Sequence, residues 1–242
     1  MNPFTTKPQY SPDTLEAAIR HLRDSEQLHI QLGQAAMHAD HGKLFSEDLV
    51  VLGVIQRSLD LIDGFTTLTE KGNSTAAIPL LRLQLDNCMR FFACALVHDA
   101  SQVVGNLLSG KPINKIKSRS GNRLTDQYLH EQLNARYPWF SQVYKFASGF
   151  IHLSTPGMVG SVAAVGSEKQ RIVYHHIGFG AGRAWKEAEK KEAVDAFIGA
   201  TEVLCDLLGS WGVTKEKVAG EHYAADQHPE NARVKMPEKD DA

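Results

Sequence analysis

The chain has 242 residues, which is enough to bury a substantial core in one domain. Hydrophobic residues make up 43% of it and charged residues 22%, as in ordinary soluble globular proteins. The formal net charge of −2 excludes a general attraction to nucleic acids or anionic membranes. Binding to nucleic acid would therefore need a local basic patch.

The N-terminal stretch, MNPFTTKPQYSP, lacks the basic start and apolar core of a signal peptide. No uncharged apolar run approaches the ~20 residues of a membrane span, so we expect a cytoplasmic protein with no membrane partner. The three cysteines, Cys88, Cys94 and Cys205, form no CxxC pair. We therefore expect buried, reduced thiols, with no disulfide framework, no bound metal and no cofactor.

Helix signals dominate the first two thirds of the chain. Ser11 and Pro12 form a cap and first-turn pair for a helix that runs towards His38. Ser46, with two acidic residues behind it, begins a second helix to about Glu70. That helix is apolar nearly all round, so we expect it to be central in a bundle.

A third helix follows the turn after Glu70. Ser74 caps it, Pro79 falls in its early turns, and we expect it to continue to Leu108. Thr125 then caps a short helix, and Pro138 begins another.

After these helices the pattern changes. Two β-branched runs around the polar turn GSEKQ predict a small β-hairpin near 158–177. An amphipathic helix through Val194 and Leu208 follows, and the polar, proline-bearing chain over 214–242 predicts a disordered tail. The predicted fold is mainly α: residues 1–213 form one bundle of five or six helices, with the hairpin inserted before the last long helix.

Three charges stand alone in the most apolar predicted helix. Between Ile78 and Val97 the only charged residues are Arg82, Asp86 and Arg90, and their spacing of four puts them on one helix face. Charges inside a buried helix are costly unless they are paired or used. In one interpretation Asp86 holds one arginine while the other contacts a phosphate or carboxylate. In the other, the row is a self-satisfied ion network or faces solvent.

A second polar row, Tyr144, Ser148 and His152, interrupts another apolar helix at the same spacing, with Lys145 beside it. Histidine is the side chain best suited to proton transfer near neutral pH. Ser148 precedes His152 by one turn, as a serine–histidine pair would require, but no nucleophile elbow or acidic orienter accompanies them. Alternatively, His152 is a buried histidine stabilised by the negative end of its helix.

A basic segment lies between the third helix and the helix capped by Thr125. Residues 111–123, KPINKIKSRSGNR, contain five basic residues and no acidic one. The segment is a candidate anion-binding loop, although it has no interleaved aromatic residue for base stacking. The alternative is a solvated, mobile connection. The basic residues are Lys111, Lys115, Lys117, Arg119 and Arg123.

Two further patterns are weaker. Residues 178–183, GFGAGR, follow a predicted strand and precede a helix, as anion-cradling loops do, but they lack the third glycine of the dinucleotide fingerprint. We expect a flexible connector there. His38, Asp40 and His41 resemble a metal cluster only loosely.

Residues 46–154 resemble the HEPN-like helical superfamily and allied uncharacterised bacterial helical proteins. The stretches LLRLQLDNCMRFF and YKFASGFIHLS carry this resemblance. It implies a metal-independent ribonuclease, often from a toxin–antitoxin or anti-phage system. The signature of active members places an arginine a few residues before a histidine. His152 matches the histidine, but the residue seven positions earlier is Lys145 and no arginine lies between them.

The leading functional hypothesis is a HEPN-like protein that binds or cleaves RNA or nucleotides. His152 would be the acid or base, Lys145, Arg82 or Arg90 the phosphate clamp, and Asp86 the residue that orients an arginine. The rival is a non-catalytic interaction module whose polar rows are structural and which binds a protein partner or a second copy. A third hypothesis is a small-molecule hydrolase that uses Ser148 and His152.

Overall fold

The computed structural model describes residues 11–151, 162–166, 173–177 and 185–226, and these are mainly helical. The α-helices are α1 (Leu15–Asp24), α2 (Glu26–His38), α3 (Ser46–Glu70), α4 (Ser74–Leu96), α5 (Ala100–Leu108), α6 (Asp126–Arg136), α7 (Phe140–Ile151) and α9 (Glu187–Asp226). Single 3-10 turns lie at Asp40–Gly42 and Ile113–Lys115.

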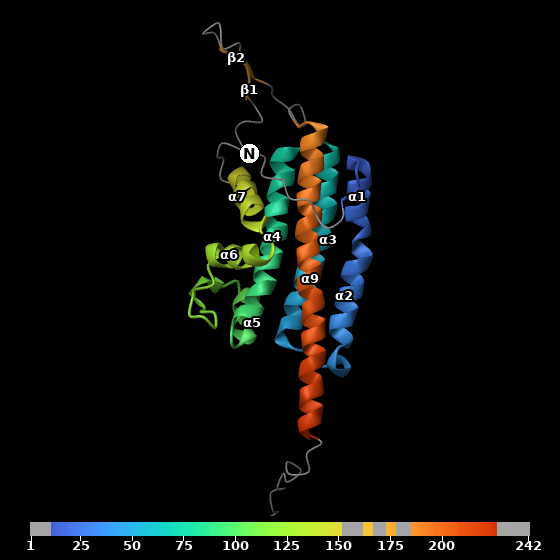
Figure 1. The fold of residues 1–242 in the computed structure, drawn as a ribbon, viewed down its shortest axis with the longest axis vertical. Coiled ribbons are helices and arrows are strands. Elements are labelled where there is room, and N and C mark those ends of the chain that lie inside the picture. Colours follow the sequence, from blue (N-terminus) through green and yellow to red (C-terminus); the bar gives the residue numbers. More distant parts are fainter. Residues whose placement is uncertain (1–10, 152–161, 167–172, 178–184, 227–242) are drawn as a thin grey trace, which may run out of the picture.

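The long helices lie side by side around one hydrophobic core. Helix α9 packs against α1, α2 and α4, and α3 packs against α4. Helices α1 and α2 follow one another along one side of the bundle, whereas α5, α6 and α7 lie on the other side of α4 (Figure 1). This arrangement places one face of α4 against α6 and α7.

The first predicted helix is in fact two helices that meet at Ser25. Its hydroxyl donates to the carbonyl of Leu22 at 2.6 Å, a local bond that competes with a continuous helix. Thr14, rather than Ser11, caps α1 by accepting from the Ala17 amide. Ser11 instead contacts Asp195 of α9.

Helix α3 has the predicted bounds, Ser46 and Glu70. The amide of Phe45 donates to the Asp48 carboxylate at 2.8 Å, so an acidic side chain in the first turn holds the start of the helix. The helix packs against α1, α2, α4, α5 and α9, as expected for a central helix. It nevertheless exposes one stripe, on which Leu49 and Leu52 are about half exposed.

The predicted helix from Ser74 to Leu108 is divided, because α4 ends at Leu96 and Asp99 caps a separate helix, α5. The division has a tertiary cause. The Arg119 amide donates to the Leu96 carbonyl and Arg119 Nε donates to the Val97 carbonyl, each at 2.8 Å. The basic loop therefore satisfies the carbonyls at the end of α4, which a continuing helix would have used.

The short helix α6 begins as predicted, because the Thr125 side chain accepts from the Tyr128 amide at 3.2 Å. Helix α7 begins at Phe140, just after Pro138. Because two predicted helices are each divided, the described residues contain more α-helices than the five or six predicted.

Helix α9 continues to Asp226, although a disordered tail was predicted from 214. The reason is visible at Lys215, whose side chain is 0% exposed and lies 2.8 Å from the Asp48 carboxylate. Residues 227–242, the rest of the predicted tail, lie outside the described residues. The stretch Glu187–Lys217 has the length and apolar composition of a membrane span, but 56% of its apolar window is buried in the bundle, as in a core helix.

Two short strands, β1 (Val162–Gly166) and β2 (Val173–Ile177), are described within the segment predicted as a hairpin. They pair antiparallel, with Val162 opposite Ile177. The turn between them, the residues that flank them and the segment 178–183 lie outside the described residues.

Candidate functional site

The two predicted polar rows meet at Arg82. From α4, Arg82 Nε donates to the Ser148 hydroxyl of α7 at 3.1 Å, and its Nη2 donates to the Tyr144 hydroxyl. The guanidinium carbon lies 3.9 Å from the centroid of the Tyr144 ring, so the arginine also stacks on the tyrosine. The Arg82 side chain is only 12% exposed, which places it inside the contact between α4 and α7.

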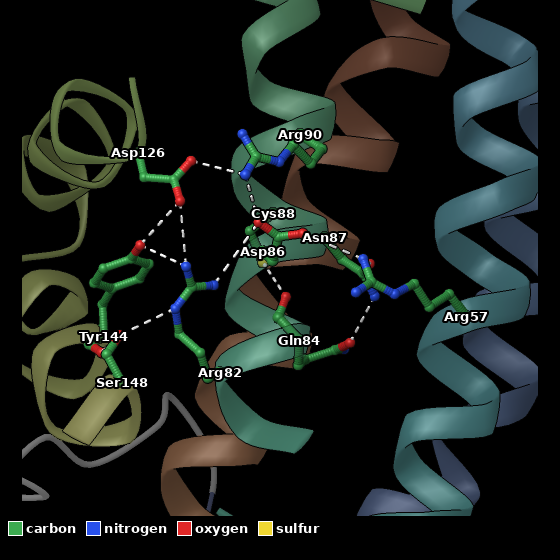
Figure 2. A network of polar contacts seen from close by, with 10 residues as sticks. All are labelled: Arg57, Arg82, Gln84, Asp86, Asn87, Cys88, Arg90, Asp126, Tyr144 and Ser148. Atoms are coloured by element: carbon green, nitrogen blue, oxygen red, sulfur yellow. Dashed lines mark hydrogen bonds and ion pairs between the residues drawn. The ribbon is translucent and has the colours of Figure 1, made fainter. Parts of the chain in front are cut away.

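Two carboxylates complete the surroundings of the arginines (Figure 2). Asp86 lies 3.8 Å from Arg82 Nη1 and 3.0 Å from Arg90 Nη2. Asp126, the first residue of α6, lies 3.4 Å from Arg82 Nη2 and 2.7 Å from Arg90 Nη2. Asp126 also accepts from the Tyr144 hydroxyl at 3.3 Å. Arg82 and Arg90 are therefore paired with carboxylates from their own helix and from α6.

Sequence reasoning missed Asp126, and also Arg57 of α3. Arg57 Nη1 lies 3.3 Å from the second oxygen of Asp86 and donates to the Asn87 side chain at 2.9 Å. The available signal for Asp126 was its place directly after the helix cap Thr125, where acidic residues favour the positive helix end. Pairing between separate helices cannot be read from spacing along one helix.

The network continues into the core as neutral hydrogen bonds. Asn87 donates to Gln84 at 3.0 Å, and Gln84 donates to the Ser58 hydroxyl at 2.7 Å. Ser58 Oγ lies 2.9 Å from His29 Nε2, and His29 Nδ1 lies 2.8 Å from the Ser25 carbonyl. These buried polar groups satisfy one another, as low-dielectric surroundings require.

The electrostatics agree with a structural role for these charges. Burial opposes the charge of Arg90, but Asp86 and Asp126 more than offset this and raise its pKa. Burial raises the pKa of Tyr144, with Asp126 opposing the effect of Arg82, so its hydroxyl stays protonated and able to donate. Burial lowers the pKa of His130, whose ring centroid lies 4.7 Å from that of Tyr144; Glu131 opposes this, and the charges of Lys145 and Arg82 add to it.

Of the four predicted catalytic side chains, the structure brings Arg82 and Arg90 together around Asp86 and Asp126. Lys145 is exposed on α7, and among the described residues it forms no ion pair with the carboxylates of the network. His152 lies outside the described residues. The Ser148 hydroxyl donates to the Tyr144 carbonyl at 2.8 Å while it accepts from Arg82, so its proton is directed to the backbone and not to a base.

The basic loop, residues 111–123, is held at several points. Beyond the contacts of Arg119 with the end of α4, the Leu124 amide donates to the Ile116 carbonyl at 2.9 Å and Lys117 pairs with Arg123 in an antiparallel bridge. Ile113 and Leu124 are buried and anchor the loop to the core. The loop is therefore a defined ribbon that presents its charged side chains.

All five basic side chains of the loop are exposed, and in the described part of the chain none of them forms an ion pair. The rest of the chain holds 21 of the 26 basic residues and all 28 acidic residues, a net charge of −7. The loop thus concentrates five positive charges on an otherwise acidic protein.

The remaining candidates contribute less. Among the described residues, no group of three or more histidine, cysteine or acidic side chains is placed to hold a metal ion, and this applies to the cluster around Asp40. The cysteines are free thiols, with Cys88 and Cys94 buried and Cys205 partly exposed.

No protein-family model matches this chain, and no curated protein or solved structure matches it either.

Proposed function

We propose that this protein is a helical RNA-binding module in which the basic loop contacts phosphates and the charged network around Asp86 holds the bundle together. The observation that supports this most is the set of five exposed basic side chains on a loop fixed to α4 and α6, none of which forms an ion pair within the described part of the chain. Cation contacts with phosphates supply most of the sequence-independent affinity for nucleic acid. The loop has no aromatic residue between its cations, so we expect backbone contact without base stacking.

Binding without cleavage fits the contacts of Arg82. A phosphate clamp needs a guanidinium with free donors facing the scissile group. Every nitrogen of Arg82 that can donate has a partner in the network or lies within ion-pair distance of Asp86. A HEPN-like relationship, a bacterial defence or toxin–antitoxin setting and a cytoplasmic location remain part of this proposal.

The test measures RNA binding and RNA cleavage together. Purified protein is mixed with a fluorescent single-stranded RNA in EDTA, and anisotropy and RNA length are followed. The loop variant carries Lys115→Gln, Lys117→Gln and Arg123→Gln. The matched control carries Lys71→Gln, Lys186→Gln and Lys217→Gln, three exposed lysines outside the loop. We expect the loop variant to bind about tenfold or more weakly and the control to bind like wild type.

Two outcomes would contradict this function. Equal binding by the loop variant and wild type would remove the loop as the RNA contact. Cleavage in EDTA that disappears in His152→Ala or Arg82→Ala, at an unchanged melting temperature, would show a metal-independent nuclease instead of a binding module.

A second candidate is a protein-interaction module, supported by three exposed leucines at the start of α3. Leu44 is 72% exposed, Leu49 50% and Leu52 49%, and the last two share a helix face. The predicted hairpin near 158–177 would be a further contact element in this case. Sedimentation of wild type and Leu49→Ser/Leu52→Ser tests it, since only an oligomer through this face would dissociate in the variant.

A further inference from the structure

The charged network around Asp86 carries one positive charge in excess. Three arginines, Arg57, Arg82 and Arg90, face two carboxylates, Asp86 and Asp126. Arg82, Asp86 and Arg90 have side chains that are 12%, 16% and 23% exposed. An uncompensated positive charge in such partly desolvated surroundings attracts an anion more strongly than the same charge in water.

Two of the three arginines have donors to spare. Among the described residues, the contacts of Arg57 use only Nη1, and those of Arg90 use only Nη2. Each guanidinium therefore retains its Nε and its other Nη for a ligand. Arg82 differs, because its Nε and both Nη groups already face Ser148, Tyr144 and the carboxylates.

The two arginines with spare donors lie on either side of Asp86, and that carboxylate holds both in place. Arg57 Nη1 lies 3.3 Å from one oxygen of Asp86, and Arg90 Nη2 lies 3.0 Å from the other oxygen. One carboxylate thus spans both guanidinium groups, from α3 and from α4 (Figure 2). Since the side chains are already oriented, a ligand would not have to order them on binding.

The site is open to solvent at both ends. The Arg57 side chain is 42% exposed and the Asp126 side chain 44% exposed. Asp126 also follows Arg123, the last cation of the basic loop, by only three residues. A nucleic acid on the loop would therefore reach the network at Asp126.

We propose that Arg57 and Arg90 form a binding site for a phosphate monoester, either the terminal phosphate of an RNA or the phosphate of a free nucleotide. A monoester carries a charge of about −1.5 to −2 near neutral pH, more than a phosphodiester or a carboxylate, and suits a cluster with excess positive charge. Guanidinium forks bind phosphate oxygens in pairs. The RNA arm of this proposal rests on the proposed function, whereas the nucleotide arm does not.

The first arm of the test uses free nucleotide. AMP and adenosine are titrated against the full chain and binding is followed by calorimetry. We expect AMP to bind and adenosine not to bind, and Arg57→Gln to abolish AMP binding. The matched control is Arg20→Gln, an exposed arginine of α1 that pairs with Glu16 of the same helix. Asp126→Asn should strengthen AMP binding about tenfold, because it removes a repulsive carboxylate; a purely structural network would give no gain.

The second arm uses the same RNA with a 5′-phosphate or a 5′-hydroxyl end. We expect the phosphorylated RNA to bind about tenfold more tightly, and Arg57→Gln to remove this preference but keep the remaining affinity. AMP binding without RNA binding would retain the site and overturn the RNA-binding function. Equal behaviour of AMP and adenosine, or AMP binding that survives in Arg57→Gln, would overturn the site.

Discussion

Asp86 is the residue on which three guanidinium groups converge, from Arg57, Arg82 and Arg90. Removing its charge would leave Arg82 and Arg90 with Asp126 alone, and Arg57 with no carboxylate among the described residues. We expect Asp86→Asn to lower the free energy of unfolding by roughly 3 kcal/mol, since it leaves partly buried charges without a partner. Urea unfolding followed by circular dichroism measures this.

The matched control is Asp60→Asn, on the exposed stripe of α3, where the carboxylate accepts from Gln56 of the same helix. We expect this variant to stay within about 0.5 kcal/mol of wild type. An equally small effect of Asp86→Asn would mean that the network does not stabilise the bundle.

His29 gives the protein a defined pH dependence. Burial lowers its pKa below the ordinary value of 6.5, with the Ser25 carbonyl opposing this. As pH falls below 6.5, the unfolded chain binds a proton that the folded chain still refuses, so stability falls. The stability that His29 contributes is present in full well above pH 6.5. It falls between pH 6.5 and the lowered pKa of the folded state, and below that pKa His29 causes no further loss.

Unfolding measured in urea from pH 7.5 to 5 tests this dependence. One such group contributes a slope of at most about 1.4 kcal/mol per pH unit, and His130, whose pKa burial also lowers, adds to it. We expect His29→Gln to flatten the slope. A slope unchanged in this variant would exclude His29 as a cause.

At the scale of elements, distant contacts decide where helices end. Arg119 closes α4 by bonding to the Leu96 and Val97 carbonyls. Lys215 does the opposite for α9, since its ammonium reaches the Asp48 carboxylate and the Ala36 carbonyl, each at 2.8 Å. Trp211 adds a bond to the same carboxylate, also at 2.8 Å. These contacts tie α9 to the start of α3, through Asp48, and to the end of α2, through Ala36.

We expect Lys215→Met to destabilise the protein by about 3–5 kcal/mol, because it leaves Asp48 charged and buried without its cation. Lys217→Met changes an exposed lysine two residues further along the same helix and should be nearly neutral. Thermal melts of both variants, followed by circular dichroism, compare the two. Similar melting temperatures would show that the pair does not hold α9.

At the scale of the whole molecule, charge is segregated. A net charge of −7 outside the basic loop would repel a polyanion from most of the surface, so the loop would set its orientation. With five cations engaged, single-stranded RNA affinity should fall with salt, so that log Kd rises with log salt with a slope of about +3.5. The triple loop variant should reduce this slope by about 2. Salt-independent binding would contradict phosphate contact by the loop.

Much of the helical architecture was predictable, because caps and apolar periodicity are local signals. The start of α3 at Ser46 and the cap at Thr125 are examples. The breaks at Ser25 and after Leu96 were not predicted, since a hydroxyl bond and a distant arginine cause them. In the candidate site, the rows that begin at Arg82 and at Tyr144 were predicted, because polar residues stand out in apolar helices. Arg57 and Asp126 were not predicted.

The sequence by itself determined a mainly helical chain, a row of charges on an apolar helix and a cluster of cations between 111 and 123. These are properties of composition and of spacing within one segment. Only the tertiary structure decided what the charges do. It set Arg82 against Tyr144 and Asp126, shared Asp86 among three arginines, and buried Lys215 beside Asp48. Pairing depends on distances between helices, and the packing of the whole core fixes those distances.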